Sequence, residues 1–200
     1  MVLTILGILS SIIFLIGDLP YFIDTLRGKT KPQRVTWGIF CALNTIGFAN
    51  QLASGADNSL WLFGAGVVAT GAIFIASLFR GVGGYARMDA YVMLVALAGV
   101  GLWLLFDSPE LSIVVSALVA GASMVPTFAK AKKHPETETR LAWLLGALSA
   151  CLAAVSVGAL DWRLLLLPVN ATILQAYMVY ILYIKAKKRA NTQQSEARLL

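Results

Sequence analysis

Residues 17–37 read GDLPYFIDTLRGKTKPQRVTW, and residues 123–143 read SMVPTFAKAKKHPETETRLAW. In both copies a proline stands near the end of an apolar run, a hydrophilic basic connector follows, and a tryptophan comes 17 positions after the proline. An internal repeat of this kind indicates a duplicated structural unit. Because the runs before the connectors are apolar, we interpret it as a duplicated membrane unit. The matching pairs are Pro20 with Trp37 and Pro126 with Trp143.

The composition is that of a membrane protein. Of the 200 residues, 58% are hydrophobic and only 13% are charged, whereas about 25% of the residues of a soluble domain are charged. The formal net charge of +6 could suggest a nucleic-acid partner. However, the basic residues lie in short connectors between apolar segments and form no continuous basic face that follows a phosphate backbone. We therefore expect a lipid bilayer around the chain and no nucleic-acid partner.

Seven segments are long enough, or nearly so, to cross a hydrocarbon core of about 30 Å as helices. They lie near residues 2–22, 35–53, 60–79, 91–106, 111–128, 141–160 and 164–184. The fourth segment is the shortest and matches the others weakly, which suits a linker helix. The first has no basic residues before it and no small-residue cleavage pattern after it, so we interpret it as a retained span and not as a signal peptide.

Basic residues predict the orientation, because connectors rich in Lys and Arg stay on the cytoplasmic side. Of the 16 Lys and Arg residues, all but Arg163 lie in one alternate set of connectors and the C-terminal segment. This places the N-terminus outside and the C-terminus in the cytoplasm. Two parallel three-helix units that both start outside need a single crossing between them. We therefore expect an all-α integral membrane fold with a first bundle at 1–80, a linker with the fourth span at 81–107, a second bundle at 108–189 and a disordered tail at 190–200.

This layout of three helices, one linker helix and three helices resembles the SWEET sugar transporters and the wider PQ-loop superfamily. Pro20 and Pro126 match the proline that bends the first helix of each bundle in that family, although neither is followed by the glutamine of the PQ-loop pattern. The segment LLLLPVNATILQAY of the seventh span resembles the Pro-Asn element of the sugar transporters, with one extra residue before Asn170. The resemblance implies that Asn170 contacts a transported solute. Its partner asparagine in the third span is missing, because Gly66 stands at the matching position.

Asp18 is the only charged residue inside the seven predicted spans. A carboxylate in hydrocarbon is energetically costly, so such a residue usually faces a cavity or a partner. Asp18 either exchanges a proton or holds a cation during transport, or it caps a helix that restarts at Pro20 in the sequence Asp-Leu-Pro. The two roles are compatible, and both stay open.

The prolines of the repeat, Pro20 and Pro126, lie at matching points of the two copies. A proline inside a helix removes one hydrogen bond and bends the backbone. We interpret both prolines as hinges in the cytoplasmic half of the first helix of each bundle, where gating would open and close the inner path. A static kink that only improves packing is the alternative.

The second and sixth spans carry candidate residues for solute binding. Trp37, Asn44 and Gln51 recur at heptad spacing and share one face of the second span. Uncharged amides on one face of a membrane helix either line a wet cavity or hydrogen-bond a neighbouring helix. Trp143 is the counterpart of Trp37, but small residues replace the amides in the sixth span. Both tryptophans also fit an aromatic belt at the membrane interface.

In the seventh span, Asn170 and Tyr177 share one face, whereas Gln175 lies on roughly the opposite face. We therefore expect Asn170 and Tyr177 to contact the solute and Gln175 to bond a neighbouring helix. Ser123 in the fifth span would add a hydroxyl to the site. The alternative for this serine is a bond to the preceding turn of its own helix.

The cysteines and the single histidine predict no further chemistry. Cys41 and Cys151 lie inside apolar spans, so we interpret them as packing residues without a disulfide. His134 stands in a basic connector and lacks partners for a metal site or a catalytic triad. We therefore expect no cofactor, no metal and no enzymatic activity.

Taken together, these features predict a transporter or facilitator in the cell membrane that moves a small polar, neutral, sugar-like solute by alternating access. A nicotinamide-riboside-type vitamin transporter, with Trp37 or Trp143 stacked on the nucleoside, is one alternative. A non-transporting receptor or scaffold similar to the KDEL-type cargo receptors is another, although such a receptor would want cationic groups and the predicted spans contain no Lys or Arg. Whether the chain forms a homo-oligomer is left open.

Overall fold

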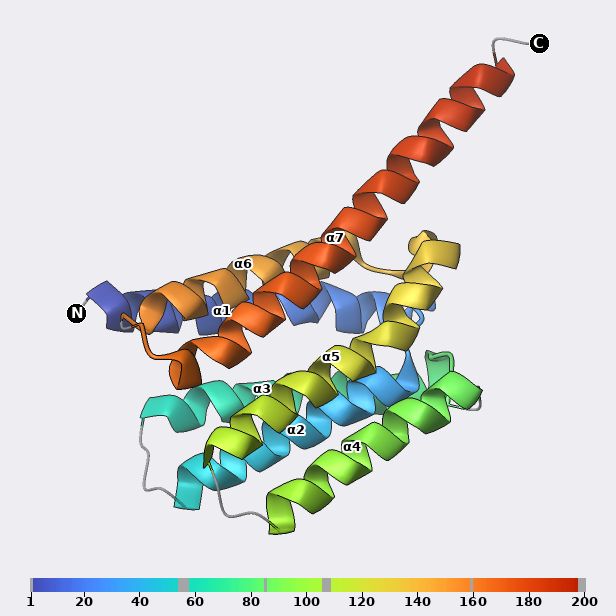
Figure 1. The fold of residues 1–200 in the computed structure, drawn as a ribbon. Helices are drawn as coiled ribbons and strands as arrows, with labels where there is room; N and C mark the ends of the chain where they lie inside the picture. The colour runs from blue at the N-terminus through green and yellow to red at the C-terminus, as the bar shows by residue number, and fades with distance from the viewer. Residues whose placement is uncertain (1, 54–57, 85, 106–108, 159, 198–200) are drawn as a thin grey trace.

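The computed structural model describes residues 2–53, 58–84, 86–105, 109–158 and 160–197 (Figure 1). Within these residues the chain forms seven α-helices, one short 3₁₀ turn and no strand. The elements are α1 (Val2–Leu26), α2 (Arg34–Ala53), α3 (Asn58–Arg80), α4 (Arg87–Leu105), α5 (Pro109–Lys133), η1 (Pro135–Thr137), α6 (Arg140–Ser156) and α7 (Trp162–Ala197). Each predicted span overlaps one of these helices.

The ends of the helices follow from local sequence. α1 is followed by Gly28 with φ 73°, and α6 by Gly158 with φ 66°. Glycine adopts this left-handed conformation without strain and is therefore common just after a helix. In contrast, α7 continues to Ala197 and projects beyond the other helices in Figure 1. α7 therefore includes residues 190–197, for which the sequence predicts a disordered tail and whose Ala, Gln and Glu residues favour a helix.

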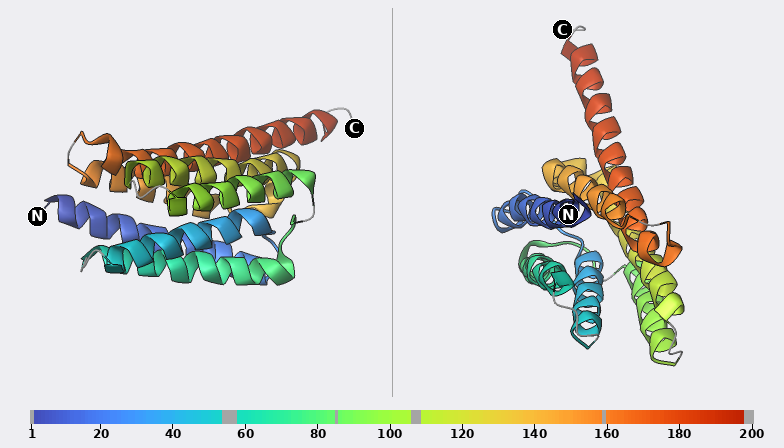
Figure 2. Two further views of the ribbon diagram at one scale, coloured as in Figure 1. Left: turned by 60° about the horizontal axis from the view of Figure 1, so that its bottom comes forward. Right: turned by 90° about the vertical axis from the view of Figure 1, so that its left-hand side faces the viewer.

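The two three-helix units have the same internal order. α3 packs between α1 and α2, and α7 packs between α5 and α6. Among the described residues, the backbones of α1 and α2 do not approach each other closely, and neither do those of α5 and α6. The units meet where α1 packs on α6 and α2 packs on α5, so the six helices close into a ring that Figure 2 shows nearly end-on. α4 lies outside this ring against α5 and α2. The duplication seen in the sequence is therefore also present in the packing.

α1 shows an apolar outer face and a small or polar inner face. Its buried residues are Ser10, Gly17, Tyr21 and Thr25. Several of its outward aliphatic side chains are between 48% and 57% exposed, among them Ile5, Ile8, Ile12, Ile16 and Leu19. A helix of a soluble protein buries its apolar stripe in the core. The reversed arrangement is what contact with lipid requires.

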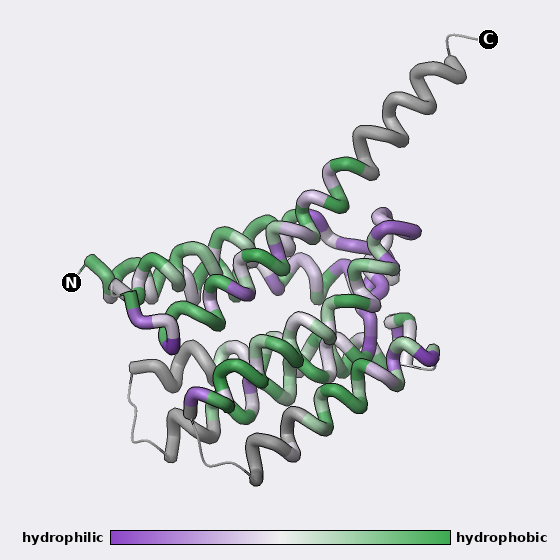
Figure 3. The backbone as a smooth tube through the Cα atoms, viewed as in Figure 1, coloured by the Kyte–Doolittle hydropathy of each residue, from purple (hydrophilic) through white to green (hydrophobic). Residues whose placement is uncertain are grey.

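The distribution of hydropathy agrees with a membrane protein. Figure 3 shows apolar residues along the bodies of the helices and hydrophilic residues gathered at their ends. Among the described residues, three helical segments are long and apolar enough to cross a membrane: Val2–Leu26, Glu110–Lys133 and Trp162–Ile184. We conclude that the chain is a helical membrane protein.

The two interfaces between the units differ in closeness. Along α1 and α6, an added Cβ at Gly17 would lie 3.0 Å from Leu145 Cβ, so glycine allows the helices to approach. The hydroxyls of Ser10 and Ser149 each donate to the other residue's carbonyl, at 2.9 Å and 2.8 Å. α2 and α5 are in contact over a shorter stretch of helix, where the Thr36 hydroxyl bonds to α5. The α1–α6 interface is therefore the more extensive of the two.

Candidate functional site

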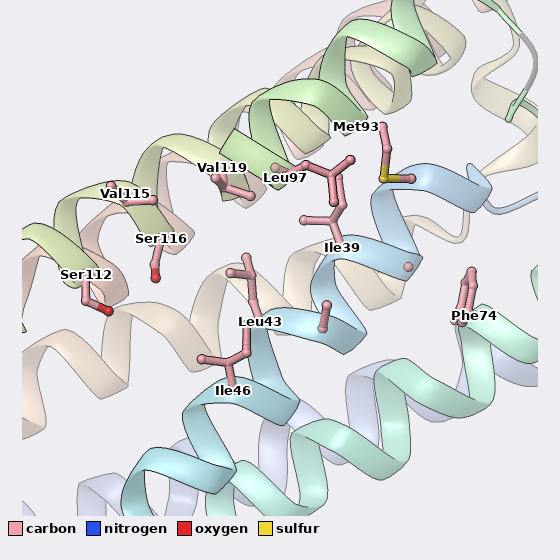
Figure 4. A pocket seen from close by; sticks show the side chains of 13 residues that line it. Ile39, Leu43, Ile46, Phe74, Met93, Leu97, Ser112, Val115, Ser116 and Val119 are labelled. Carbon is pink, nitrogen blue, oxygen red and sulfur yellow. The ribbon is translucent and has the colours of Figure 1, made fainter. Parts of the chain in front are cut away.

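An apolar cavity with a volume of about 280 Å³ lies between α2, α4 and α5. Figure 4 shows Leu43, Leu97 and Val115, from three different helices, around this space. The polar side chains in its lining are Ser112 and Ser116. A polar solute would lose its bonds to water here and gain few in return.

The second cavity is central and is lined by all six helices of the ring. Its volume is about 210 Å³, below the range of about 300–1,000 Å³ that is usual for drug-sized ligands. Its lining residues are Phe14, Asp18, Tyr21, Trp37, Phe40, Asn44 and Thr70 from the first unit, and Ala120, Met124, Ala142, Trp143, Leu167, Asn170, Ala171, Leu174 and Gln175 from the second. The predicted residues Asp18, Trp37, Asn44, Trp143 and Asn170 are thus brought together around one small space.

Asp18 faces this central cavity. α1 runs from Val2 to Leu26 without a break at Pro20, so no second helix begins there for Asp18 to cap. Asp18 Oδ2 is buried and has no hydrogen-bond partner among the described residues. An unpaired buried acceptor is energetically costly. The Asp18 carboxyl group is therefore available to bind a ligand, an ion or a proton. The capping role considered from the sequence finds no support.

Two asparagine amides line the cavity from opposite units. Asn44 Nδ2 donates to Phe40 O in its own helix at 2.9 Å, and Asn170 Nδ2 donates to Ala117 O of α5 at 3.2 Å. A Cβ at Gly66 of α3 would lie only 2.4 Å from Asn44 Oδ1. The Asn44 amide therefore occupies the space left by Gly66, the position at which the third span lacks an asparagine.

Tyr177 does not line the central cavity, contrary to the prediction, and Gln175 does. Tyr177 is 40% exposed and packs edge-on against Phe128 of α5, with the ring centroids 4.9 Å apart. Gln175 lies against Gly146 of α6, where an added Cβ would be 1.7 Å from Gln175 Oε1. α7 is the middle helix of its unit and therefore turns a wide face to the cavity. Asn170 lies at the α5 edge of that face and Gln175 at the α6 edge.

Three aromatic residues form a layer at the end of the cavity nearest the basic connectors. Tyr21, Trp37 and Trp143 are 1%, 4% and 5% exposed. The Tyr21 ring centroid lies 4.8 Å from that of Trp37 and 6.0 Å from that of Trp143, and the two tryptophan centroids are 6.5 Å apart. Residues of an interfacial belt contact lipid headgroups, so burial rules out the belt alternative for these two tryptophans.

A buried carboxylate behind the aromatic layer joins the two units. The Glu138 side chain, just before α6, is fully buried. Its Oε2 accepts hydrogen bonds from the Tyr21 hydroxyl at 3.1 Å and from Trp143 Nε1 at 2.8 Å, and Glu138 forms an ion pair with Lys130. Lys130 also donates to the carbonyl of Lys31 in the first unit. We call Glu138, Lys130, Tyr21 and Trp143 the Glu138 cluster.

The Glu138 cluster is not evident from the sequence. Glu138 lies in a hydrophilic connector, where an acidic residue among basic ones is ordinarily solvated. The available signal was weak: Glu138 stands five residues before Trp143, close enough for the two side chains to meet at the start of a helix.

The remaining predicted residues lie away from the cavity. Ser123 is buried outside its lining, and the Ser123 hydroxyl donates to Ala120 O of its own helix at 2.8 Å, which matches the alternative given for this serine. Pro20 and Pro126 both lie inside continuous helices, in the half of α1 and α5 nearer the basic connectors. The side chain of Gln51 lies outside the described part of the chain.

Neither a metal site nor a known protein indicates the function of this chain. Within the described ranges, no group of three or more His, Cys, Asp or Glu side chains could hold a metal ion. Cys41 and Cys151 are free thiols. Comparison with protein-family models, curated proteins and solved structures gives no match for this chain. The function is therefore inferred from the geometry of the site.

Proposed function

We propose that this chain is a membrane transporter or facilitator that binds a small polar solute in the central cavity and moves it by alternating access between its two three-helix units. In this proposal all seven helices cross the cell membrane, with the N-terminus outside and the basic connectors in the cytoplasm. One observation carries it: the cavity lies between the two units and is lined by Asp18, Asn44, Asn170 and Gln175. Polar groups enclosed by helices with aliphatic outer faces provide a route for a polar solute through hydrocarbon.

The Glu138 cluster and the aromatic layer support a gate at the basic end of the cavity. Opening toward that end would separate Tyr21 and Trp37 of the first unit from Glu138 and Trp143 of the second. Pro20 directly precedes Tyr21, so bending α1 at Pro20 would move the Tyr21 hydroxyl away from Glu138. A few polar contacts can be broken without unpacking whole helices, which suits a gate.

The proposal includes membership of the SWEET and PQ-loop transporters. Its support is the packing order, in which the third helix of each unit lies between the other two and α4 lies outside the ring. Asn170, the residue that resembles the solute contact of the sugar transporters, lines the cavity.

The two alternatives raised by the sequence gain no support from the site. Trp37 and Trp143 pack against each other and against Tyr21, so a nucleoside would have to force these rings apart. No Lys, Arg or His is among the lining residues, so a receptor for a peptide carboxylate would lack a cationic partner.

Uptake by the purified protein in liposomes tests the proposal. We expect at least one solute from a panel of sugars, polyols, amines and vitamins to enter faster than into empty liposomes, and Asn170→Ala to abolish that uptake. Thr45→Ala is a suitable control, because Thr45 is exposed and bonds to Cys41 O in its own helix. Uptake equal to that of empty liposomes across the whole panel would reject transport.

A further inference from the structure

We propose that the ligand of the central cavity carries a positive charge, and that the cavity binds a small organic ammonium group with Asp18 as counter-ion and aromatic rings as walls. The role of this ligand as a transported solute rests on the proposed function, whereas its binding does not. The inference departs from the neutral, sugar-like solute that the sequence predicts.

The charge of Asp18 is not balanced within the cavity. Among the described residues, Asp18 is the only Asp or Glu in the lining of the cavity, and no basic residue accompanies it there. Its Oδ2 is buried and has no partner among the described residues. The other buried carboxylate nearby, Glu138, already has Lys130 as its ion-pair partner. A buried carboxylate is strongly unfavourable without a compensating charge, and in this cavity a cationic ligand would supply that charge.

Aromatic side chains form a large part of the wall of the cavity that Asp18 faces. Five aromatic residues line the same cavity: Phe14, Tyr21, Trp37, Phe40 and Trp143. The face of an aromatic ring is negative and attracts a cation, most strongly in tryptophan and where water is excluded. The buried rings of Trp37 and Trp143 meet both conditions. A carboxylate and several aromatic rings in the lining of one cavity match an alkylammonium group, whose charge spreads over methyl or methylene groups.

An organic cation fits this lining better than a metal ion does. Hard metal ions in proteins are usually held by several carboxylate or carbonyl oxygens at once, whereas Asp18 is the one acidic residue among the described residues that line the cavity, and five aromatic residues line it as well. No cluster of acidic, cysteine or histidine side chains is present within the described ranges. The volume of about 210 Å³ leaves room for a molecule of several heavy atoms. The amides of Asn44 and Asn170 remain available to bond a polar group at the other end of that molecule.

Binding of choline tests the inference directly. The probe is radiolabelled choline, bound to the purified full-length protein in maltoside detergent without choline lipids. The competitor is dimethylbutanol, the uncharged isostere in which carbon replaces the ammonium nitrogen. We expect choline to compete at least about tenfold better than the alcohol, because the alcohol has neither the charge nor the cation–π attraction. Asp18→Asn should weaken choline binding by at least about tenfold.

Controls distinguish loss of the charge from loss of the fold. Asp18→Glu keeps the charge and should retain preference for choline over the alcohol. Glu136→Gln removes an exposed carboxylate of the α5–α6 connector and should bind choline as the unmodified chain does. Equal competition by choline and dimethylbutanol, or unchanged choline binding in a folded Asp18→Asn variant, overturns the inference.

Uptake measurements keep the two proposals apart. If choline binds through Asp18 but no solute enters liposomes, the cation site stands and transport is rejected. If a neutral sugar enters liposomes while choline neither binds nor competes, transport stands and the cation site is rejected.

Discussion

At the scale of single residues, the shape of the cavity wall depends on two glycines, which have no side chain. Gly66 and Gly146 leave the space that the amides of Asn44 and Gln175 occupy. Two helices can approach closely at a glycine, but here each glycine accommodates a polar group at the cavity wall. We therefore expect the lack of side chains at these two positions to contribute to ligand binding as well as to packing.

Gly66→Ala tests this role of glycine. The new Cβ would lie 2.4 Å from Asn44 Oδ1, so the amide must move, and the end of a flexible side chain moves at little cost. We expect the melting temperature to change little and solute uptake or choline binding to fall about tenfold, as loss of one or two hydrogen bonds implies. Thermal unfolding and binding are measured on the same preparation.

The matched control is Gly121→Ala in α5, where an added Cβ meets nothing within 4 Å. It should leave both measurements unchanged. Normal binding and uptake in Gly66→Ala would show that the position of Asn44 is unimportant.

Glu138→Gln tests the buried ion pair. Glutamine keeps an oxygen that can accept the bonds from Tyr21 and Trp143, but it leaves the Lys130 charge without its partner, although only 10% of the Lys130 side chain is exposed. Removing one member of a buried pair typically costs about 3–5 kcal/mol. We therefore expect a marked decrease in the melting temperature, measured by circular dichroism in detergent.

The double variant with Lys130→Met and Glu138→Gln should recover much of this loss, because no unpaired charge remains. Glu136→Gln, in the same connector but exposed, should have almost no effect. A Glu138→Gln variant as stable as the unmodified chain would mean that the pair contributes nothing.

At the scale of helices, the sequence predicts well where each helix lies along the chain and predicts poorly which face of the helix points inward. Long apolar runs separated by polar connectors locate all seven helices, because hydrocarbon admits few alternatives. Which face of a helix looks inward depends on its neighbours, which a single sequence does not reveal. Tyr177 and Gln175 illustrate the difficulty, since the width of the inner face of α7 follows from its place between α5 and α6.

Pro20→Ala and Pro126→Ala test the proposal that these prolines act as hinges in α1 and α5. Alanine restores a backbone hydrogen-bond donor and favours the helix, so each variant should be at least as stable as the unmodified chain. If the prolines act as hinges, straighter helices should slow uptake severalfold while choline binding persists. Initial uptake rates in liposomes provide the measurement.

Unchanged uptake in both proline variants would favour the static kink. A decrease in only one of them would assign the moving helix to that unit.

At the scale of the whole molecule, orientation in the membrane is the first property to test. His134→Cys and Leu160→Cys are introduced separately into a chain whose own cysteines, Cys41 and Cys151, are replaced by alanine. Both sites are exposed, His134 in the basic α5–α6 connector and Leu160 in the connector at the other end of α6. We expect a membrane-impermeant maleimide to label Leu160→Cys in intact cells and His134→Cys only after the membrane is opened.

Labelling of both sites in intact cells, or of His134→Cys alone, would contradict the predicted orientation. The cysteine-free chain, treated with the same maleimide, gives the background labelling for both measurements.

The overall plan of two units and one linker helix could be predicted from the repeat, but the contacts that join the units could not. The repeat aligns Tyr21 with Thr127 and Glu138 with Pro32, so the hydrogen bond between Tyr21 and Glu138 has no aligned counterpart, and Thr127 bonds to Thr36 instead. Such contacts arise at positions where the two copies differ. An alignment of the copies shows these positions but does not show which residues contact each other.

The same asymmetry has an evolutionary consequence. The first half contributes the hydroxyl of Tyr21, and the second half contributes Glu138 and Lys130. Two copies of the first half would bring together two tyrosines without a carboxylate, and two copies of the second half would bring together two carboxylates without a tyrosine. If the gene arose by fusion of two identical halves, those halves have since become unlike partners, and a substitution at position 21 that removes the bond to Glu138 affects a residue in the opposite half of the chain.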